Sequence, residues 1–208
     1  MTDVPPGVRR DGLKAVLFDV YGTLVGIGAA QGRQPRAGDA ALIMGRSVGL
    51  VDAADLLGIR LTDAQRAGLE DDLRAEIASI VPFDDALPAL LDLKRSGLRV
   101  GLCSNLAADY AAPVLAALPV AFDALAWSFA AGAIKPDAAI YAYACRQLGC
   151  PPGDVLMVGD TVDADVDEPR AFGMQAVLLD REGRGRTAEA IASLSALCNR
   201  LDRTRRQP

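Results

Sequence analysis

The sequence predicts an α/β protein in which a parallel sheet carries helices on both faces and a small helical cap is inserted after the first strand. Two observations support this prediction. Five short apolar runs alternate along the chain with segments of helical periodicity, and the gap between the first and second runs is far longer than the others. The 208 residues are 51% hydrophobic and 24% charged. They suffice for one folded domain with an insert of about 60 residues.

The apolar runs are predicted to be buried strands, because they lack the alternation of polar and apolar side chains that a half-buried strand shows. Strands that are buried on both faces are typical of parallel sheets, so we expect right-handed crossover connections through helices. The five runs are Ala15–Phe18, Arg99–Cys103, Ala124–Trp127, Val155–Val158 and Ala176–Leu179.

Three segments between the later strands carry apolar residues at helical spacing. They are Asp85–Ser96, Asp109–Leu118 and Asp137–Leu148. Pro136 and Asp137 are a start signal for the third segment, and Gly149 is a stop signal. Helices that join consecutive parallel strands predict a doubly wound, Rossmann-like sheet.

About 80 residues separate the first predicted strand from the second, which is more than one crossover helix needs. Two helical stretches, at about 39–57 and 63–79, occupy the middle of this gap. The stretch Gly26–Gly38 is rich in Gly, Gln and Arg and is predicted to be a flexible entry into the insert.

The chain therefore divides into four predicted parts. They are a flexible N-terminus (1–12), a core domain (13–24 and 83–199), a helical cap (25–82) and a basic C-terminal tail (200–208).

The composition excludes several kinds of chemistry. The chain has no histidine, which removes Ser-His-Asp and Cys-His mechanisms and histidine-ligated metals. A metal site would therefore be rich in oxygen and would suit a hard cation such as Mg²⁺. The four cysteines have no CxxC spacing, so neither a zinc site nor a disulfide framework is indicated.

Charge and hydropathy argue against nucleic-acid and membrane partners. Residues 1–180 hold 15 basic and 24 acidic side chains, whereas residues 181–208 hold seven and three, and we expect the basic end to be solvated. No apolar stretch approaches the roughly 20 residues that cross a bilayer, and the first twelve residues lack the apolar centre of a secretory signal. We expect a cytoplasmic protein with a small-molecule ligand, whose oligomeric state neither periodicity nor charge indicates.

Polar residues follow the predicted strands at the sheet edge where ligands bind in open parallel sheets. Carboxylates that meet at such an edge repel each other by roughly 4 kcal/mol at 4 Å and an effective dielectric of 20, unless a cation lies between them. A lysine and a bound divalent cation are the candidates, although a solvated acidic helix start would also explain the acidic segment 160–168. The residues are Asp19 after the first strand, Ser104 and Asn105 after the second, Lys135 beyond the third, and Asp160 and Asp165 after the fourth.

Four segments at these strand ends carry a family resemblance. Together they resemble, in order and spacing, the four motifs of the haloacid dehalogenase-like hydrolase superfamily. The resemblance spans residues 14–180 and implies a capped member of the phosphatase or dehalogenase type; most members are Mg²⁺-dependent phosphatases. The segments are AVLFDVYGTLV, GLCSN, IKPD and VGDTVDADVDEPRAFGM.

The resemblance implies a catalytic role for four of these residues. Asp19 would be the nucleophile that forms an aspartyl-phosphate intermediate. Thr23 would orient the nucleophile or the phosphoryl group. Ser104 would donate a hydrogen bond to a phosphoryl oxygen, and Lys135 would neutralise both that group and Asp19.

The resemblance also implies a metal cofactor, Mg²⁺. Asp19, Asp160 and the backbone carbonyl of Tyr21 would hold the ion, and Asp165 would complete the metal shell or anchor Lys135. Asn105 is a further candidate for binding substrate together with Ser104 and Lys135; alternatively, it closes the turn after the second strand.

The sequence departs from the family's motifs at two positions. Most phosphatases of the superfamily have an Asp two residues after the nucleophile, where this chain has Tyr21. A phenol with a pKa near 10 is a poor general base at neutral pH, and loss of the acid/base lowers a rate by about 10²–10⁴-fold. Pro169 stands where the family usually has a small residue, and it predicts a helix that begins near Asp165 to Asp167 with Asp165 slightly displaced.

The main hypothesis is Mg²⁺-dependent hydrolysis of a small phosphomonoester through an aspartyl-phosphate, and two alternatives remain. The motif DVYGTL is also typical of the 2-haloacid dehalogenase branch, in which Asp attacks carbon and displaces halide without metal. Against this alternative, the branch has Ser where this chain has Asp160. The second alternative is a weakly active protein that binds a phospho-ligand and has lost its acid/base. The sequence does not identify the leaving group.

Overall fold

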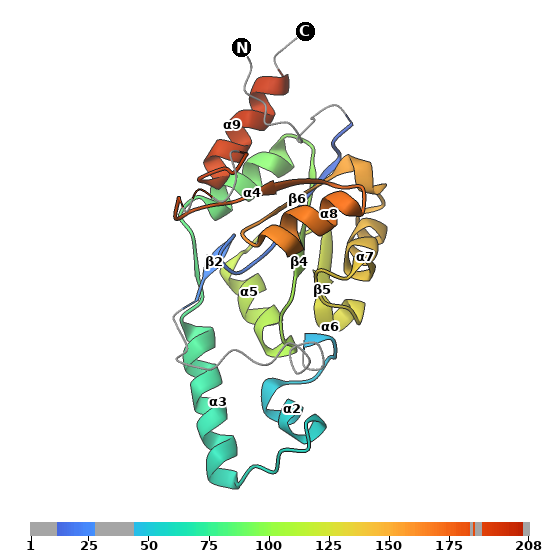
Figure 1. Cartoon of the computed structure of the whole chain (residues 1–208). Helices are drawn as coiled ribbons and strands as arrows, with labels where there is room; N and C mark the ends of the chain where they lie inside the picture. Colours follow the sequence, from blue (N-terminus) through green and yellow to red (C-terminus); the bar gives the residue numbers. More distant parts are fainter. Residues whose placement is uncertain (1–11, 28–43, 184, 186–188, 206–208) are drawn as a thin grey trace.

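The computed structural model describes residues 12–27, 44–183, 185 and 189–205. Within them, five strands form a parallel sheet in the order β5-β4-β1-β6-β7, with helices on both faces (Figure 1). This arrangement confirms the predicted Rossmann-like α/β fold. The strands are β1 (Ala15–Phe18), β4 (Arg99–Ser104), β5 (Ala124–Trp127), β6 (Val155–Gly159) and β7 (Gln175–Leu178).

The observed strands coincide with the five predicted apolar runs to within one residue at each end. The four residues of β1 are all buried, and β1 is hydrogen-bonded to β4 on one side and to β6 on the other. A central parallel strand has no solvent-facing side, which explains why its sequence is continuously apolar.

Successive residues of β1 contribute to two separate apolar cores. Val16 and Phe18 belong to the core beneath α4, α5 and α9, whereas Ala15 and Leu17 belong to the core beneath α7 and α8. This division follows from the alternation of side chains along a strand. The sheet is therefore covered on both faces, and its carboxyl edge remains available for a site.

The core helices form where the apolar spacing predicts them, but one predicted helix is divided into two pieces. The predicted helix Asp109–Leu118 is a short 3-10 turn, η1 (Ala108–Tyr110), followed by α5 (Ala111–Ala117). No helix within the described residues is both long and apolar enough to cross a membrane. The other core helices and turns are α4 (Ala86–Arg95), α6 (Ser128–Ala131), α7 (Ala138–Leu148), η2 (Pro152–Asp154), η3 (Asp163–Asp167), α8 (Glu168–Ala171) and α9 (Leu194–Arg205).

The C-terminal segment differs from the predicted tail. The helix α9 continues through residue 200 to Arg205, so the expected boundary between core and tail falls inside a helix. Leu194, Leu197 and Leu201 are buried on one face of α9, which packs against α4. The local excess of arginines hides this apolar spacing, since the arginines occupy the other positions of the helix.

The inserted segment begins and ends in a two-stranded antiparallel ribbon of β2 (Val25–Gly26) and β3 (Val81–Pro82). Between these strands lie α2 (Leu50–Leu56) and α3 (Asp63–Ala78), which stand beyond one end of the sheet in Figure 1. Most of the predicted flexible entry and the start of the first predicted cap helix, within 28–43, lie outside the described residues.

Candidate active site

The site lies at the carboxyl edge of the sheet, where three neighbouring strands end. Asp19 directly follows β1, Ser104 is the last residue of β4, and Asp160 directly follows β6. Because β1 lies between β4 and β6, the sheet order brings these residues together from three distant parts of the sequence.

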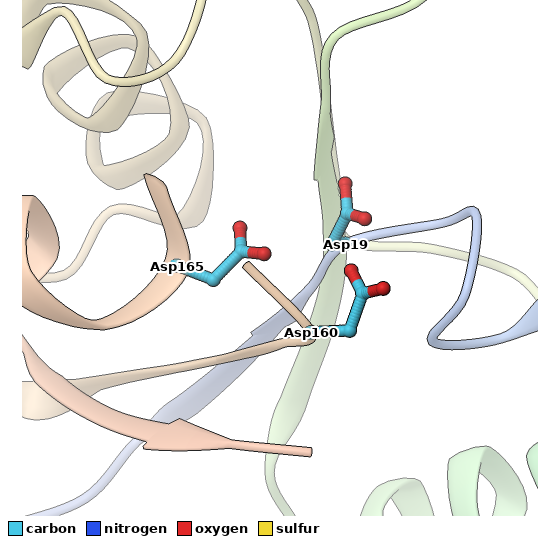
Figure 2. Close-up of side chains that lie close together, drawn as sticks. All are labelled: Asp19, Asp160 and Asp165. Atoms are coloured by element: carbon cyan, nitrogen blue, oxygen red, sulfur yellow. The ribbon is translucent and has the colours of Figure 1, made fainter. Parts of the chain in front are cut away.

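Three carboxylates converge at this edge. One carboxylate oxygen of each of Asp19, Asp160 and Asp165 lies within 4.8 Å of the others (Figure 2). Asp165 belongs to η3, the turn that follows β6, and it is fully buried. The repulsion between three such charges has to be offset by positive charge.

Lys135 supplies part of that positive charge. Its Nζ atom lies 2.7 Å from Oδ1 of Asp19 and 2.6 Å from Oδ1 of Asp165, and its side chain is only 4% exposed. Burial disfavours the charged lysine, but the charges of Asp19 and Asp165 outweigh burial and raise the pKa of Lys135. The lysine therefore remains a cation between two buried carboxylates.

Asn105 positions Lys135. Its Nδ2 atom donates a hydrogen bond to the backbone carbonyl of Lys135 at 2.8 Å, and its Oδ1 atom accepts one from the backbone N–H of Lys135 at 2.6 Å. Both polar atoms of the Asn105 side chain are thus engaged with the backbone beyond β5. This geometry favours a positioning role for Asn105 over the direct contact with substrate that the sequence suggested.

Asp165 holds the lysine from the other side. Its Oδ2 atom accepts a hydrogen bond from the backbone N–H of Thr161, while Oδ1 contacts Lys135. Burial raises the pKa of Asp165, and the charge of Lys135 opposes that shift. A Cβ atom on Gly159 would lie 2.3 Å from the Asp165 carboxyl carbon, so this packing requires glycine at the end of β6. Of the two roles considered for Asp165, the geometry favours the anchor for Lys135.

The helix after β6 begins earlier than Pro169 suggested. The π-helical turn η3 starts at Asp163, and α8 follows from Glu168 with Pro169 in its first turn. Since the two helical pieces are continuous, Pro169 lies six residues inside the segment, just after its π-helical turn. The predicted start near Asp165 to Asp167 is therefore wrong, and Asp165 lies inside the turn in contact with Lys135.

The two hydroxyl residues predicted for the site, Thr23 and Ser104, are both buried. Thr23 is fully buried, and its hydroxyl makes no hydrogen bond to the rest of the described chain. Ser104 is 2% exposed at the end of β4. The structure thus places both predicted hydroxyl residues at the carboxyl edge of the sheet.

Tyr21 contacts Tyr110 of the core, and the charge of Glu76 in the inserted segment acts on it. Its ring packs edge-on against Tyr110, with centroids 6.1 Å apart and planes at 87°. Burial, followed by the Glu76 carboxylate of α3, raises the pKa of Tyr110. Burial, followed by the charges of Glu76 and Asp19, raises the pKa of Tyr21 far above its usual value. No local motif marks Tyr110 or Glu76, since only the fold brings them beside Tyr21.

The acidic cluster fits a hard divalent cation. Its oxygens, at most 4.8 Å apart, are only slightly more widely spaced than the roughly 4.2 Å between opposite ligands of one octahedral Mg²⁺. Burial and the charge of Asp19 raise the pKa of Asp160, which a bound cation would reverse. Gly22 has a φ of +76°, and a Cβ there would lie 2.3 Å from Oδ2 of Asp160. The loop after β1 therefore keeps space for the Asp160 carboxylate.

A pocket of about 190 Å³ opens beside Asp160. Arg181 closes one side of it: the guanidinium pairs with Asp85, donates to the backbone carbonyl of Thr23 at 2.7 Å, and stacks 4.1 Å from the centre of the Phe83 ring. No local motif marks Arg181, because its partners lie about 100 to 160 residues away in the sequence. The pocket is lined by Gly22, Phe83, Asp160, Leu179, Asp180, Arg181 and Glu182.

Charged groups that are buried together at the ligand-binding edge of a doubly wound sheet are typical of α/β enzymes, since such groups are costly to bury for stability alone. Residues 13–173 match the haloacid dehalogenase-like hydrolase family, and the chain belongs to that family of hydrolases.

Relatives of this chain include both phosphatases and dehalogenases. Glyceraldehyde 3-phosphate phosphatase of Methanothermobacter thermautotrophicus is 30% identical over 109 residues, which are 51% of this chain and 48% of that protein. The chain thus spans about half the length of that relative. (S)-2-haloacid dehalogenase 4A of Burkholderia cepacia is 28% identical over 198 residues, 83% of this chain and 85% of that protein.

The fold is shared with solved structures. The crystal structure of a HAD phosphatase from Thermococcus onnurineus superimposes with a TM-score of 0.64 at 21% identity, and the match covers 90% of this chain and 97% of that one. The likeness extends over nearly the whole chain and concerns the fold.

Proposed function

We propose that the protein is a Mg²⁺-dependent phosphatase that hydrolyses a small phosphomonoester through an aspartyl-phosphate on Asp19. The observation that carries the proposal is the convergence of the Asp19, Asp160 and Asp165 oxygens within 4.8 Å of one another. Such a cluster of like charges suits a divalent cation and a phosphoryl group whose negative charge that cation offsets.

Each residue has a role in this reaction. A carboxylate oxygen of Asp19 attacks phosphorus, the bond from phosphorus to the ester oxygen breaks, and that oxygen takes a proton from water and leaves as the alcohol. Lys135, which already contacts Asp19, neutralises charge that builds up on the phosphoryl oxygens. Ser104 donates a hydrogen bond to a phosphoryl oxygen, and Thr23 orients the group. Water then hydrolyses the acyl phosphate and releases Asp19 for the next turnover.

The metal would be held by Asp19, Asp160 and the backbone carbonyl of Tyr21. When bound there, Mg²⁺ supplies Lewis-acid stabilisation of the negatively charged phosphoryl group. Asp165 serves the site indirectly in this proposal, because both of its oxygens are engaged by Lys135 and Thr161.

Residues 25–82 act as a cap in this proposal. The insert is joined to the core through the β2–β3 ribbon, and Glu76 of α3 reaches Tyr110 of the core. A cap that closes over Asp19 would exclude water during phosphoryl transfer and select the leaving group.

The decisive experiment measures hydrolysis of 4-nitrophenyl phosphate with Mg²⁺, with EDTA and with an Asp19→Asn variant. We expect turnover that requires both the metal and Asp19. The Asp160→Asn variant should need a higher Mg²⁺ concentration, whereas Asp163→Asn, a neighbouring acidic residue outside the cluster, should behave as wild type. Turnover that persists in Asp19→Asn, or that EDTA leaves unchanged, would contradict the proposal.

A second candidate is metal-independent 2-haloacid dehalogenation by Asp19. It is favoured by the alignment with the Burkholderia dehalogenase, which covers most of both chains, and by Tyr21 two residues after the nucleophile. Asp160 disfavours it, because a carboxylate substrate would be repelled there without a cation. Release of chloride from 2-chloropropionate in EDTA would establish this reaction.

A further inference from the structure

The direction of the Thr23 hydroxyl depends on the backbone of the loop that follows β1. The hydroxyl is fully buried and makes no hydrogen bond to the rest of the described chain, so no partner fixes the side chain before substrate binds. Threonine is stiff at χ1, and its backbone therefore decides where the hydroxyl points. A small rotation of this backbone would misdirect the group that orients the phosphoryl group in the proposed reaction.

The loop's own hydrogen bonds hold Thr23 less firmly than its neighbours. The backbone N–H groups of Leu24 and Val25 donate to the carbonyl of Val20 at 2.8 and 3.0 Å. The N–H of Thr23 reaches the same carbonyl at 3.3 Å, the longest of the three distances. A contact from outside the loop is needed to fix the orientation of Thr23.

Arg181 supplies such a contact. Its Nη2 atom donates a hydrogen bond of 2.7 Å to the carbonyl of Thr23. The guanidinium also donates to both carboxylate oxygens of Asp85, at 2.8 and 3.2 Å, and its Cζ atom lies 4.1 Å from the centre of the Phe83 ring. The side chain is 19% exposed, so water competes little for these contacts. A planar guanidinium held by these partners presents its N–H to Thr23 in one direction.

Phe83 links Arg181 to the inserted segment. It directly follows β3, the strand through which the insert returns to the core, and its backbone N–H donates to the carbonyl of Leu24 at 3.0 Å. Arg181 therefore contacts the loop after β1 and the end of the insert at once. Asp85 neutralises the charge of Arg181, so the guanidinium contributes a fixed geometry here rather than a free positive charge.

We propose that Arg181 is a positioning residue for the reaction: it holds the backbone of Thr23 so that the buried hydroxyl meets the phosphoryl group. This inference rests on the proposed phosphatase function. Arg181 touches no reacting atom and acts through Thr23, while Asp85 and Phe83 keep its guanidinium in place.

The test is a double-mutant cycle with Arg181→Met and Thr23→Val. It measures kcat and KM for 4-nitrophenyl phosphate at saturating Mg²⁺, with enough enzyme to quantify slow variants and circular dichroism to show that each is folded. We expect Arg181→Met to lower kcat by about tenfold and to change KM by less than about threefold. In the Thr23→Val background the same substitution should lower kcat by less than about twofold, because the hydroxyl that it misdirects is already gone.

Arg181→Lys is a second variant in case Arg181→Met does not fold. It keeps a positive charge beside Asp85 but lacks the planar fork that serves Asp85 and Thr23 together. It should fold as wild type does and show the same dependence on the Thr23 hydroxyl: a lower kcat when the hydroxyl is present and little change in Thr23→Val.

Arg170→Met is the matched control. Arg170 makes the same two kinds of contact, a hydrogen bond to a backbone carbonyl, that of Ala176 at 3.0 Å, and a pair with the Glu189 carboxylate at 2.9 Å. Neither partner belongs to the loop after β1. The variant should lose some stability but keep the kcat of its parent, whether or not the Thr23 hydroxyl is present.

Two results would overturn the inference while leaving the phosphatase function intact. One is an equal fall in kcat with and without the Thr23 hydroxyl, and the other is a kcat of folded Arg181→Met and Arg181→Lys within about twofold of wild type. Wild-type protein without Asp19-dependent hydrolysis of the ester would overturn the proposed function, and the inference with it.

Discussion

Lys135 joins two buried carboxylates that lie 116 and 30 residues away in the sequence. A buried cation between two anions is stable only while all three charges are present, since removal of one leaves uncompensated charge in a medium of low dielectric. The lysine therefore supports the folded state as well as the proposed reaction.

Replacement of this lysine tests that support. Lys135→Met removes the charge but keeps the volume, and we expect the free energy of unfolding at pH 7 to fall by about 3 kcal/mol, measured by urea denaturation in EDTA. The double variant Lys135→Met/Asp165→Asn should be more stable than Lys135→Met alone, because it has one unpaired carboxylate fewer. A single variant within about 0.5 kcal/mol of wild type would show that the cluster is solvated.

The contact between Gly22 and Asp160 makes a second residue-level prediction. In Gly22→Ala, the new Cβ must displace the Asp160 carboxylate, so Mg²⁺ should bind more weakly, as measured by calorimetry. Gly97→Ala is the matched control: its φ of +84° gives a similar backbone strain, but no other atom lies within 4 Å of the new Cβ. Both variants should lose about 1 kcal/mol of stability, and equal Mg²⁺ affinities would contradict the prediction.

Asp85 ties together three elements that surround the nucleophile loop. It precedes α4, pairs with Arg181 after β7, and accepts a hydrogen bond from the backbone N–H of Leu194 at the start of α9. Arg181 in turn donates to the carbonyl of Thr23. The loop after β1, which also closes on itself through backbone hydrogen bonds to the carbonyl of Val20, is thus anchored to the elements around it.

The pKa of Asp85 gives this contact a pH dependence. Burial acts to raise the pKa, but the hydrogen bonds from Arg181 and Leu194 outweigh it and hold the pKa below 3.8. A carboxyl whose pKa is lowered by folding contributes its full stability above its unfolded pKa, and loses it as the pH falls through the folded value.

We therefore expect Asp85→Asn to be less stable than wild type by about 2 kcal/mol at pH 7, with a gap that narrows as the pH falls below about 4. Urea denaturation across this pH range measures the difference in the free energy of unfolding between the variant and wild type. Asp92→Asn is the control, since its exposed pair with Arg95 should contribute almost nothing. A gap for Asp85→Asn that stays constant with pH would contradict the prediction.

At the scale of the whole molecule, stability is distributed unevenly. The sheet lies between two apolar cores, whereas none of the residues of α3 is buried. The start of α3 relies on a capping box, in which Thr62 and Gln65 each bond the other's backbone. The inserted segment should therefore open more easily than the core.

Amide hydrogen exchange of Thr62→Ala tests this difference. Loss of an N-cap destabilises a helix by about 1 kcal/mol, so exchange in residues 63–78 should become roughly fivefold faster. Exchange in β1 and β4 should not change, because those strands belong to the cores. Equal acceleration in α3 and in β1 would show that insert and core unfold as one unit.

Much of the molecule follows from local features of the sequence. The strands were predictable because buried parallel strands are continuously apolar, and helices such as α7 because Asp137 and Gly149 mark their ends. The meeting of Asp19, Asp160 and Asp165 was predictable because parallel strands end at the same edge. The helical C-terminus was not, because the burial of Leu201 depends on α4 rather than on neighbouring residues.

The sequence by itself determined the sheet, the kinds of residue at its carboxyl edge and the family to which the chain belongs. The tertiary structure decided what each edge residue contacts: that Asn105 holds the backbone of Lys135, that Asp165 anchors the lysine, and that the Tyr21 ring packs edge-on against Tyr110. The physical reason is the separation in sequence over which each kind of interaction acts. Apolar periodicity and capping act over a few residues, whereas these contacts join groups brought together only when the sheet is assembled and the insert packs against it.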